Sequence, residues 1–463
     1  MQRLLAIVWL TWKAALRFKL FLVIAVLLLA AVVGLPLVIH DDGTARGFTQ
    51  IILTYTLSAV TGLLGISTLW LSCGTLARDI EECQIQVVAT KPIARWQIWL
   101  GKWLGIVLLN AVLLALSGVC IFGLLQWRAT KLPPEEQIKL RSEVLVARGS
   151  AKEPDRTAEL NAVAERILQG RLTNSPVERV DVPEVRRQIR EGVKADAQLV
   201  PPSYQRIWQI NLGFAKNYLQ GKPLQLRVKF NAAQKSASGT FRLEWLVGTE
   251  EMKKIWPSEP MSLAPDTFHE FPIPPDMFDQ DGVLTITVIN PPQNGTALLF
   301  PLNEGMEVLY PEGGFALNFA RGLGIIFCWM ALLAAVGLCA ASFLSFPVAT
   351  FFALSLMLVV LSSGTLAESV ENGTVAAGDE ESGTAGHSFA DSFLIPSFKG
   401  VLAVVNLAKN FSPIDALSSG RSITWSELGL AVTQIVLILG GIFVVAGILF
   451  FNRRELATAQ GTQ

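Results

Sequence analysis

Long apolar stretches at both ends of the chain constrain its fold more than any other feature. A helix needs about 20 largely apolar residues to cross the hydrocarbon core of a bilayer. The chain is 51% hydrophobic and only 16% charged, whereas soluble domains carry about 25% charged residues. We therefore expect an α-helical integral membrane protein with six transmembrane helices. The expected spans are Leu20–Ile39, Ile51–Leu76, Trp103–Leu125, Gly322–Leu344, Phe346–Leu361 and Leu428–Phe451.

The charged residues concentrate between Arg128 and Glu312, which indicates one polar domain inserted into the membrane part. Residues 1–127 then hold the first three spans and residues 315–463 the last three. The insertion divides into a helical arm, 128–202, and a β-rich part, 203–314. The chain has 38 Lys and Arg residues in total and 38 Asp and Glu residues in total. Its net charge therefore offers no support for a nucleic-acid partner.

Basic residues flank the spans unevenly, and this bias sets the expected orientation. The N-terminal segment, the segment 77–102 and the pair Arg453-Arg454 are basic, whereas 40–42 and 367–391 are acidic or lack Lys and Arg. We expect a multi-pass protein of the cytoplasmic membrane, in contact with lipid. Both termini face the cytoplasm and residues 128–314 are extracytoplasmic.

The five cysteines all lie outside the insertion, so we expect its folding to depend on an apolar core instead of disulfides. They also lack the C-x-x-C spacing of metal sites, and we predict no metal site. The residues concerned are Cys73, Cys83, Cys120, Cys328 and Cys339.

The helical arm shows short helical periodicity on two faces, separated from the spans by a flexible break over Gly149–Asp155. A long surface linker with some helix is the alternative interpretation. One face comprises Leu160, Val163, Ile167 and Leu168, and the other Val182, Val185, Ile189 and Val193.

The β-rich part alternates apolar and polar residues with a period of two, the pattern of half-buried strands. Turn-forming clusters separate the strands, and this predicts an antiparallel β-sandwich, jelly-roll or immunoglobulin-like. Its predicted core is Leu226, Val228, Leu243, Trp245, Ile286 and Val288.

Two ligand interpretations of the β-rich part are weaker than their structural alternatives. An aromatic platform for carbohydrate would comprise Trp245, Trp256, Phe268 and Phe271, but Trp245 is in phase with buried strand residues. A calcium loop would use Asp276, Asp279 and Asp281. It lacks the oxygen ligands that an EF-hand needs at Met277 and Val288, so an acidic turn is favoured.

The segment Ala77–Gly105 is a charged cassette between two spans. It contains the acidic residues Asp79 and Glu81, a β-branched and amide run from Gln84 to Val88, Thr90-Lys91-Pro92, Arg95 and Leu100-Gly101-Lys102. This order resembles the loop after the second span of ABC-2 type ABC transporter permeases. A second resemblance to that family lies in 388–420, an interrupted apolar segment expected at the outer interface instead of a seventh span. It closes with Ser419-Gly420, which leads into Ile423-Thr424-Trp425.

The resemblance implies a permease subunit with a large extracytoplasmic insertion. Such a subunit forms a homo- or heterodimer, binds a separate ABC ATPase at the cytoplasmic face, and either moves a substrate across the membrane in the export direction or transmits force. A coupling helix over about 77–88, ending near Pro92, would meet the ATPase while Ile80, Ile85 and Val88 face the spans. The implied ATPase-contact residues are Arg78, Asp79, Glu81, Glu82, Lys91 and Arg95.

No G-x-x-x-x-G-K-[ST] motif is present, so ATP hydrolysis is expected in a partner subunit and not here. We predict no enzyme activity, no catalytic residues and no cofactor. Two other classes remain: a non-transporting membrane anchor or sensor whose sandwich binds an envelope ligand such as carbohydrate, and a membrane enzyme with its site in the insertion. The sequence leaves the transported substrate open.

Overall fold

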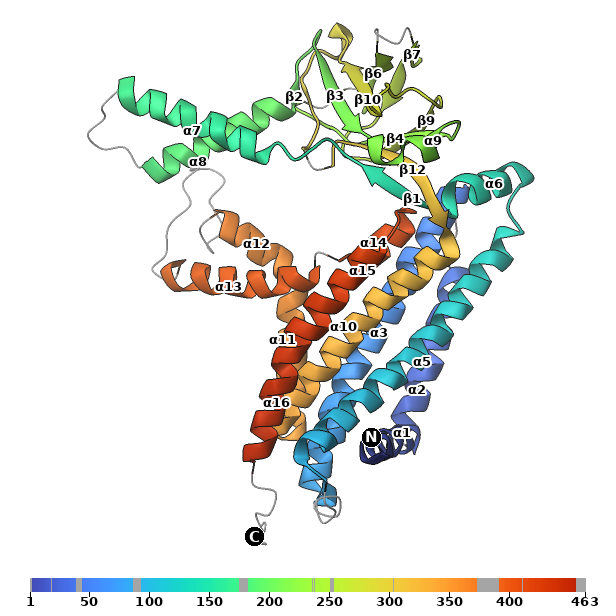
Figure 1. Ribbon diagram of the computed structural model, residues 1–463, viewed down its shortest axis with the longest axis vertical. Coiled ribbons are helices and arrows are strands. Elements are labelled where there is room, and N and C mark those ends of the chain that lie inside the picture. The colour runs from blue at the N-terminus through green and yellow to red at the C-terminus, as the bar shows by residue number, and fades with distance from the viewer. Residues whose placement is uncertain are drawn as a thin grey trace. The chain divides into compact units, whose positions relative to one another are not determined.

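The computed structural model describes residues 2–17, 19–38, 44–85, 93–174, 182–234, 236, 238–249, 254–302, 304–372, 391–409 and 411–454. The chain forms two compact units (Figure 1). The helical unit combines Met1–Val146 with Gly314–Gln463, and the β unit is Ala147–Gly313. The fold is mostly helical, with a separate β-sheet region.

The helical unit is built from long helices joined by short connections. Pro347, in the first turn of α11, has the fixed φ that favours a helix start and lets α11 begin directly after α10. The elements are α1 (Gln2–Arg17), α2 (Lys19–Val38), α3 (Ala45–Glu81), α5 (Arg95–Ala129), α6 (Pro134–Lys139), the π-helix η1 (Leu140–Val144), α10 (Phe315–Phe343), α11 (Phe346–Leu361), α12 (Ser363–Asn372), α13 (Asp391–Lys409), α14 (Pro413–Ser418), α15 (Trp425–Ala431), the π-helix η5 (Val432–Gly440) and α16 (Gly441–Arg453).

Four helices among the described residues are long and apolar enough to cross a membrane. They are Thr49–Glu81, Arg95–Ala129, Phe315–Phe343 and Trp425–Arg453. The expected first and fifth spans correspond to shorter apolar helices, Val23–Val38 in α2 and Phe346–Leu361 in α11. Six transmembrane helices therefore stay a prediction, while four are compatible with a membrane protein.

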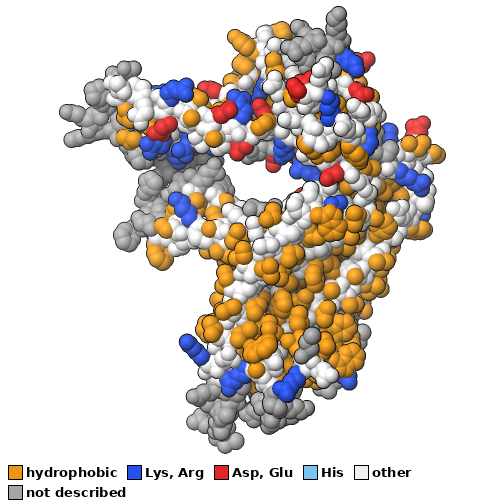
Figure 2. Space-filling view, viewed as in Figure 1, with side chains coloured by type: hydrophobic (Ala, Val, Ile, Leu, Met, Phe, Trp, Pro, Cys, Tyr) orange, Lys and Arg blue, Asp and Glu red, His pale blue; other side chains and the backbone are white. Residues whose placement is uncertain are grey.

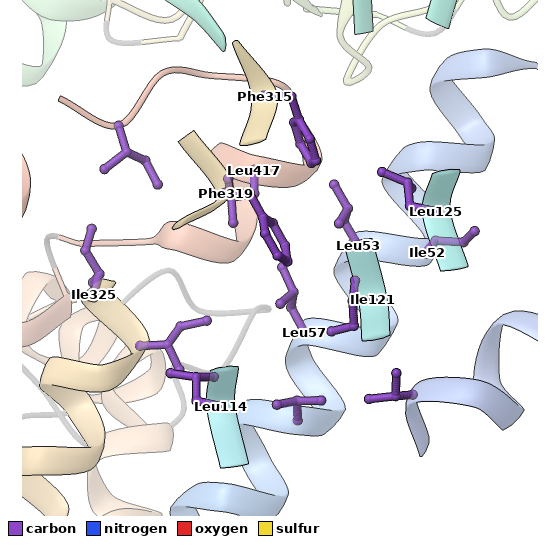
Figure 3. Packing of buried hydrophobic residues seen from close by; sticks show 14 of the residues in the cluster. Ile52, Leu53, Leu57, Leu114, Ile121, Leu125, Phe315, Phe319, Ile325 and Leu417 are labelled. Atoms are coloured by element: carbon purple, nitrogen blue, oxygen red, sulfur yellow. The ribbon is translucent and has the colours of Figure 1, made fainter. Parts of the chain in front are cut away.

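The surface of the helical unit is apolar over most of its length (Figure 2). Val119 on α5, Phe351 on α11 and Leu437 in η5 are 72%, 74% and 65% exposed. Contiguous apolar surface of this kind marks contact with a membrane or another protein. Inside, Leu53 and Leu57 of α3, Ile121 of α5 and Phe319 of α10 converge in one packed core (Figure 3).

Helix α1 is an element that the hydropathy pattern does not predict. It packs on α5, where a Cβ added at Gly101 would lie 2.7 Å from Ile7 Cγ2 and one at Gly105 would lie 2.8 Å from Thr11 Cβ. Two small residues four positions apart let helices approach closely in membranes. Trp12 Nε1 also donates to the Gly105 carbonyl at 3.0 Å.

The predicted interfacial segment 388–420 forms α13 and α14 where the structure describes it, and 388–390 lie outside the described residues. Helix α13 runs at a steep angle to α10 and α16 (Figure 1). Leu402 and Val405 are buried, whereas Phe393 is 77% exposed. A helix with one apolar side exposed and one side packed is the arrangement expected of an interfacial helix.

The compact β unit begins later than residue 128, the predicted start of the insertion. Leu132, Leu140 and Val144 are buried in the core of the helical unit. Glu136 Oε2 accepts a hydrogen bond from the Ala45 amide at the start of α3, at 2.8 Å. The boundary moves to Ala147 because these apolar residues pack onto the long helices.

The β unit contains three sheets with strand orders β1-β12-β4-β9, β3-β10-β6-β7 with β8 beside β6, and β2-β11-β5. Strand β10 pairs antiparallel with β3 and β6, and β4 pairs antiparallel with β9 and β12. The strands are β1 (Val146–Ala151), β2 (Leu199–Val200), β3 (Gln205–Asn211), β4 (Leu224–Val228), β5 (Asn231–Ala232), β6 (Phe241–Thr249), β7 (Lys254–Pro257), β8 (Met261–Leu263), β9 (His269–Ile273), β10 (Val283–Ile289), β11 (Leu298–Leu299) and β12 (Met306–Gly314). The short helices are η2 (Gly213–Ala215), α9 (Lys216–Leu219) and η4 (Pro292–Asn294).

The two larger sheets share one apolar core, as the predicted sandwich requires. All six predicted core residues, from Leu226 to Val288, are fully buried. Trp245 of β6 lies 5.6 Å from Phe271 of β9 between ring centroids, which joins the two sheets. The period of two thus identified the core correctly.

The predicted helical arm contributes strands as well as helices, which corrects its boundaries. Strands β1 and β2, from 128–202, pair into the sheets of the β-rich part. The expected flexible break at Gly149 is strand β1, where a Cβ would lie 2.3 Å from Tyr310 Cζ, so only glycine fits under that ring. Because Gly149 has no side chain, this strand lacks the alternation of side chains by which strands are recognised in a sequence.

Only α7 (Thr157–Asn174) and α8 (Val182–Gln198) form an arm. Leu168 and Ile189 are buried between them, and Arg186 Nε lies 3.2 Å from Glu165 Oε2. Val163 and Ile167, predicted on the same face as Leu168, are each 40% exposed. The two helices therefore pack through a narrow stripe.

Candidate functional site

Several segment ends meet at one end of the helical bundle, which we call the basic end. It comprises α1, the end of α3, the start of α5, the α10–α11 turn and the end of α16 (Figure 1). Arg95 at the start of α5 donates through Nη1 to the carbonyls of Phe451, Asn452 and Arg454, at 3.2, 2.8 and 3.0 Å. A cation at a helix C-terminus satisfies carbonyls that lack intrahelical partners.

Arg454 makes a similar contact with the end of α10. Its Nη1 donates to the carbonyls of Ala341 and Ser342, at 3.2 and 3.3 Å, where α10 ends. The α10–α11 turn itself, 341–346, has no basic residue. Arg454 therefore places a positive charge at this turn, although it lies more than a hundred positions away in the sequence. Counting the basic residues of each loop separately misses this charge.

Asp79 is tied to α5 by a lysine. Lys102 Nζ lies 2.5 Å from Asp79 Oδ2 and 2.7 Å from the Thr75 carbonyl. The Lys102 side chain is 10% exposed and that of Asp79 33%. The pair therefore locks the end of α3 against α5.

Arg78 and Glu81 hold the start of α11. The guanidinium carbon of Arg78 lies 4.3 Å from the ring centroid of Phe346, and that ring stacks edge-on against Trp70 at 5.5 Å. Glu81 Oε1 accepts from the Phe346 amide at 2.8 Å. An acidic group at a helix N-terminus satisfies a free amide and complements the helix dipole.

Glu82 and Gln84 are exposed, as is Glu81, but among the described residues neither contacts another helix. Glu82 ends α3, and its Oε2 accepts from Gln84 Nε2 at 2.6 Å. Cys83 between them is exposed and has a φ of 57°, a left-handed conformation that ends the helix. Among the described residues of the cassette, this tip has acidic charge without a partner in the bundle.

The six predicted contact residues are thus divided by the structure. Arg78, Asp79, Glu81 and Arg95 each contact another element of the helical unit, and Glu82 is exposed. Lys91 lies outside the described residues, as do Val88 and the predicted end at Pro92. Ile85 is buried and Ile80 packs beside it, as predicted.

The predicted coupling helix does not begin at Ala77, whereas residues 84 and 85 are helical again and 86–88 lie outside the described residues. Helix α3 continues without a break to Glu81 because no helix-breaking residue stands between Leu76 and Glu81. The charged residues therefore extend the second long helix. The sequence reasoning also missed Lys102 as a partner, although a lysine inside an apolar run is the expected signal of a functional or paired residue.

The aromatic residues considered for carbohydrate do not form a platform. Trp245 and Phe271 are core residues, and the ring of Phe268 lies under the guanidinium of Arg227, with 3.9 Å from its centroid to Cζ. Asp279 Oδ1 accepts from the amides of Asp281 and Val283, the geometry of a turn.

The described residues contain no group of three or more His, Cys, Asp or Glu side chains that could hold a metal ion. Comparison of the chain with protein-family models, with curated proteins and with solved structures gave no match.

Proposed function

We propose that this chain is the permease subunit of an ABC-2 type ABC transporter, which exports a substrate across the cytoplasmic membrane using a separate ATP-hydrolysing subunit. Two features support the proposal. One is the order of residues in the cassette from Asp79 to Lys102. The other is the way in which the end of α3 is fastened to α5 and α11 while its tip is exposed.

The fastening of α3 is the observation that carries the proposal. A partner pushing on the tip at Glu82 would move α3, and the Lys102–Asp79 pair would pass that motion to α5. The Glu81 contact with the Phe346 amide would pass it to α11. Coupling requires a stiff connection of this kind, since a solvated loop would absorb the displacement.

The proposed placement follows the positive-inside bias. The basic end carries Arg95, Arg453 and Arg454, and it faces the cytoplasm where an ABC ATPase binds. The β unit is then extracytoplasmic. Its described core is apolar and its sequence has no cysteine, so it requires no oxidative folding.

Charge reversal at the tip tests the proposal. Glu82→Lys should reduce co-purification with the ATPase subunit at least tenfold and abolish stimulation of its ATP hydrolysis. Glu135→Lys is the matched control, because Glu135 is exposed on α6 at the other end of α3. Unchanged association of Glu82→Lys would contradict the assignment of the tip as the contact.

A second variant separates contact from coupling. Glu81→Ala removes the acceptor for the Phe346 amide but leaves Glu82 in place. We expect this variant to retain association and to lose most of the stimulation of ATP hydrolysis. Equal loss of both properties would mean that Glu81 contacts the ATPase itself, as the sequence implied.

A further inference from the structure

A cavity of about 250 Å³ lies in the helical unit between α1, α2, α3 and α5. Most of its lining is apolar, including Ile24 and Leu109. Trp70, which also lines it, is 41% exposed, so the cavity is not sealed from the bundle surface. The polar lining comes from two levels: Arg78 and Thr75 near the basic end, and Ser67 and Asn110 deeper in the bundle.

The cavity is elongated along the bundle. Ser67 and Arg78 stand on the same helix, α3, and at about 1.5 Å per residue they are separated by about 16 Å along its axis. Lys102 of α5 contacts Thr75 of α3, and the two helices run antiparallel. Asn110 lies as far beyond Lys102 as Ser67 lies from Thr75, so both reach about the same depth.

The dimensions of the cavity favour a narrow ligand. A volume of about 250 Å³ distributed over about 16 Å leaves an average cross-section of about 15 Å². A cavity this narrow suits a single extended hydrocarbon chain better than a ring system or a paired set of chains.

Asn110 lines this cavity and has a hydrogen-bonding group without a partner among the described residues. Its side chain is 3% exposed, and Nδ2 has no hydrogen-bond partner among the described residues. A polar group without a partner is costly in a membrane interior, where water does not replace the missing bond. A residue of this kind within a span indicates a functional site.

Arg78 supplies charge at the other end. Within the part of the chain that the structure describes, its guanidinium packs on the Phe346 ring and forms no hydrogen bond or ion pair. Its N–H groups are therefore available to an oxyanion, the ligand that a guanidinium binds most strongly.

We propose that this cavity binds a linear amphiphile. Its carboxylate or phosphate end contacts Arg78, its hydrocarbon chain lies between α2, α3 and α5, and an oxygen atom near the far end of the chain accepts a hydrogen bond from Asn110. The site depends on the helical unit alone. Its failure would leave the proposed ATPase contact standing, and failure of that contact would leave this site standing.

A pair of probes tests the two ends separately. Binding of dodecanoate and 12-hydroxydodecanoate to the purified full-length chain is measured by calorimetry, in a detergent that does not compete. The hydroxyl of the second probe offers the oxygen that Asn110 requires. Satisfying a buried donor by a hydrogen bond changes affinity by about tenfold, so 12-hydroxydodecanoate should bind about ten times more tightly.

The variants then assign the contacts. Asn110→Leu should remove the advantage of the hydroxylated probe while dodecanoate still binds. Arg78→Gln should weaken both probes about tenfold. Asn406→Leu on α13 and Arg453→Gln at the end of α16, both exposed positions, serve as controls and should change neither affinity.

Three results would overturn the proposal. The first is no binding of either probe to the unaltered chain. The second is equal affinity for both probes in the unaltered chain and in Asn110→Leu. The third is binding of acetate or inorganic phosphate as tight as that of the long-chain probes, because the hydrocarbon chain of the probe would then contribute nothing to affinity.

Discussion

The helical unit and the β unit use apolar and charged side chains in opposite ways. The helical unit exposes residues such as Phe351 and Leu437 along its sides and keeps its charges at the ends of helices. The β unit encloses its apolar residues between two sheets. It also carries a network of buried charges on one sheet, in which Arg227 Nη1 lies 2.9 Å from Glu307 Oε1. Each pattern suits a different solvent, lipid for the first and water for the second.

The sharpest test of this contrast is topological and gives an all-or-none result. In a chain whose five cysteines are replaced, single cysteines at Gln234 or Gln293 should react with a membrane-impermeant thiol reagent on intact cells. Cysteines at Ala94 or Gln460 should react only after the membrane is opened. Reaction at Ala94 in intact cells would reverse the orientation and remove the proposed ATPase contact with it.

The next largest effect concerns the core of the β unit. Trp245→Ala should lower the free energy of unfolding by about 3–5 kcal/mol, because it removes a fully buried aromatic side chain and leaves a cavity. Urea unfolding of residues 147–313 followed by fluorescence measures the change. Trp256→Ala, at a partly buried position, should cost less.

The unfolding midpoint of residues 147–313 should not move with reductant or chelator, and a shift with chelator would revive the calcium interpretation of Asp276–Asp281.

The buried charge network should tolerate substitution poorly although it is not apolar. Glu307 is 1% exposed, and its carboxylate accepts from Arg227 and from Ser150 Oγ. Glu307→Gln should destabilise the unit by about 3 kcal/mol, since Arg227 loses a charged partner. Glu304→Gln breaks the more exposed pair with Lys229 and should cost no more than about 1 kcal/mol. Equal effects would mean that the network is as hydrated as the surface.

The smallest effect is expected at the helix ends of the membrane part. Lys102→Met should lower the thermal midpoint of the detergent-purified chain modestly, because Asp79 is one-third exposed and regains contact with water. Adding Asp79→Asn to this variant should restore part of the loss. A loss of stability as large as that caused by Glu307→Gln would show that water is excluded from the basic end.

Patterns that repeat over short distances made much of the fold predictable. The long apolar runs indicated the membrane part, and alternation along β4, β6 and β10 identified the core around Trp245. The predicted start of the coupling helix at Ala77 was wrong because the charged residues from Arg78 to Glu81 are compatible with helix, so α3 continues through them. Strand β1 was missed because Gly149 and its neighbours carry no alternation.

The position of the candidate site in the sequence was predictable, but the contacts of its residues in the fold were not. The cassette was recognisable from residue types in order, but the division between the fastened Arg78, Asp79 and Glu81 and the exposed Glu82 depends on partners elsewhere. The start of α11 holds one of those partners, Phe346, whose sequence neighbours give no hint of this role.

The sequence by itself determined which segments are long apolar helices compatible with a membrane, which form a two-sided sheet and which helix ends are basic, because hydropathy, periodicity and charge are local properties. Only the tertiary structure decided which charges are paired and which polar groups are left open. Arg95 meets carbonyls 356 and 359 positions away, and Asn110 faces a cavity formed by four helices. Such contacts arise when helices pack side by side, and sequence spacing does not encode which faces will meet.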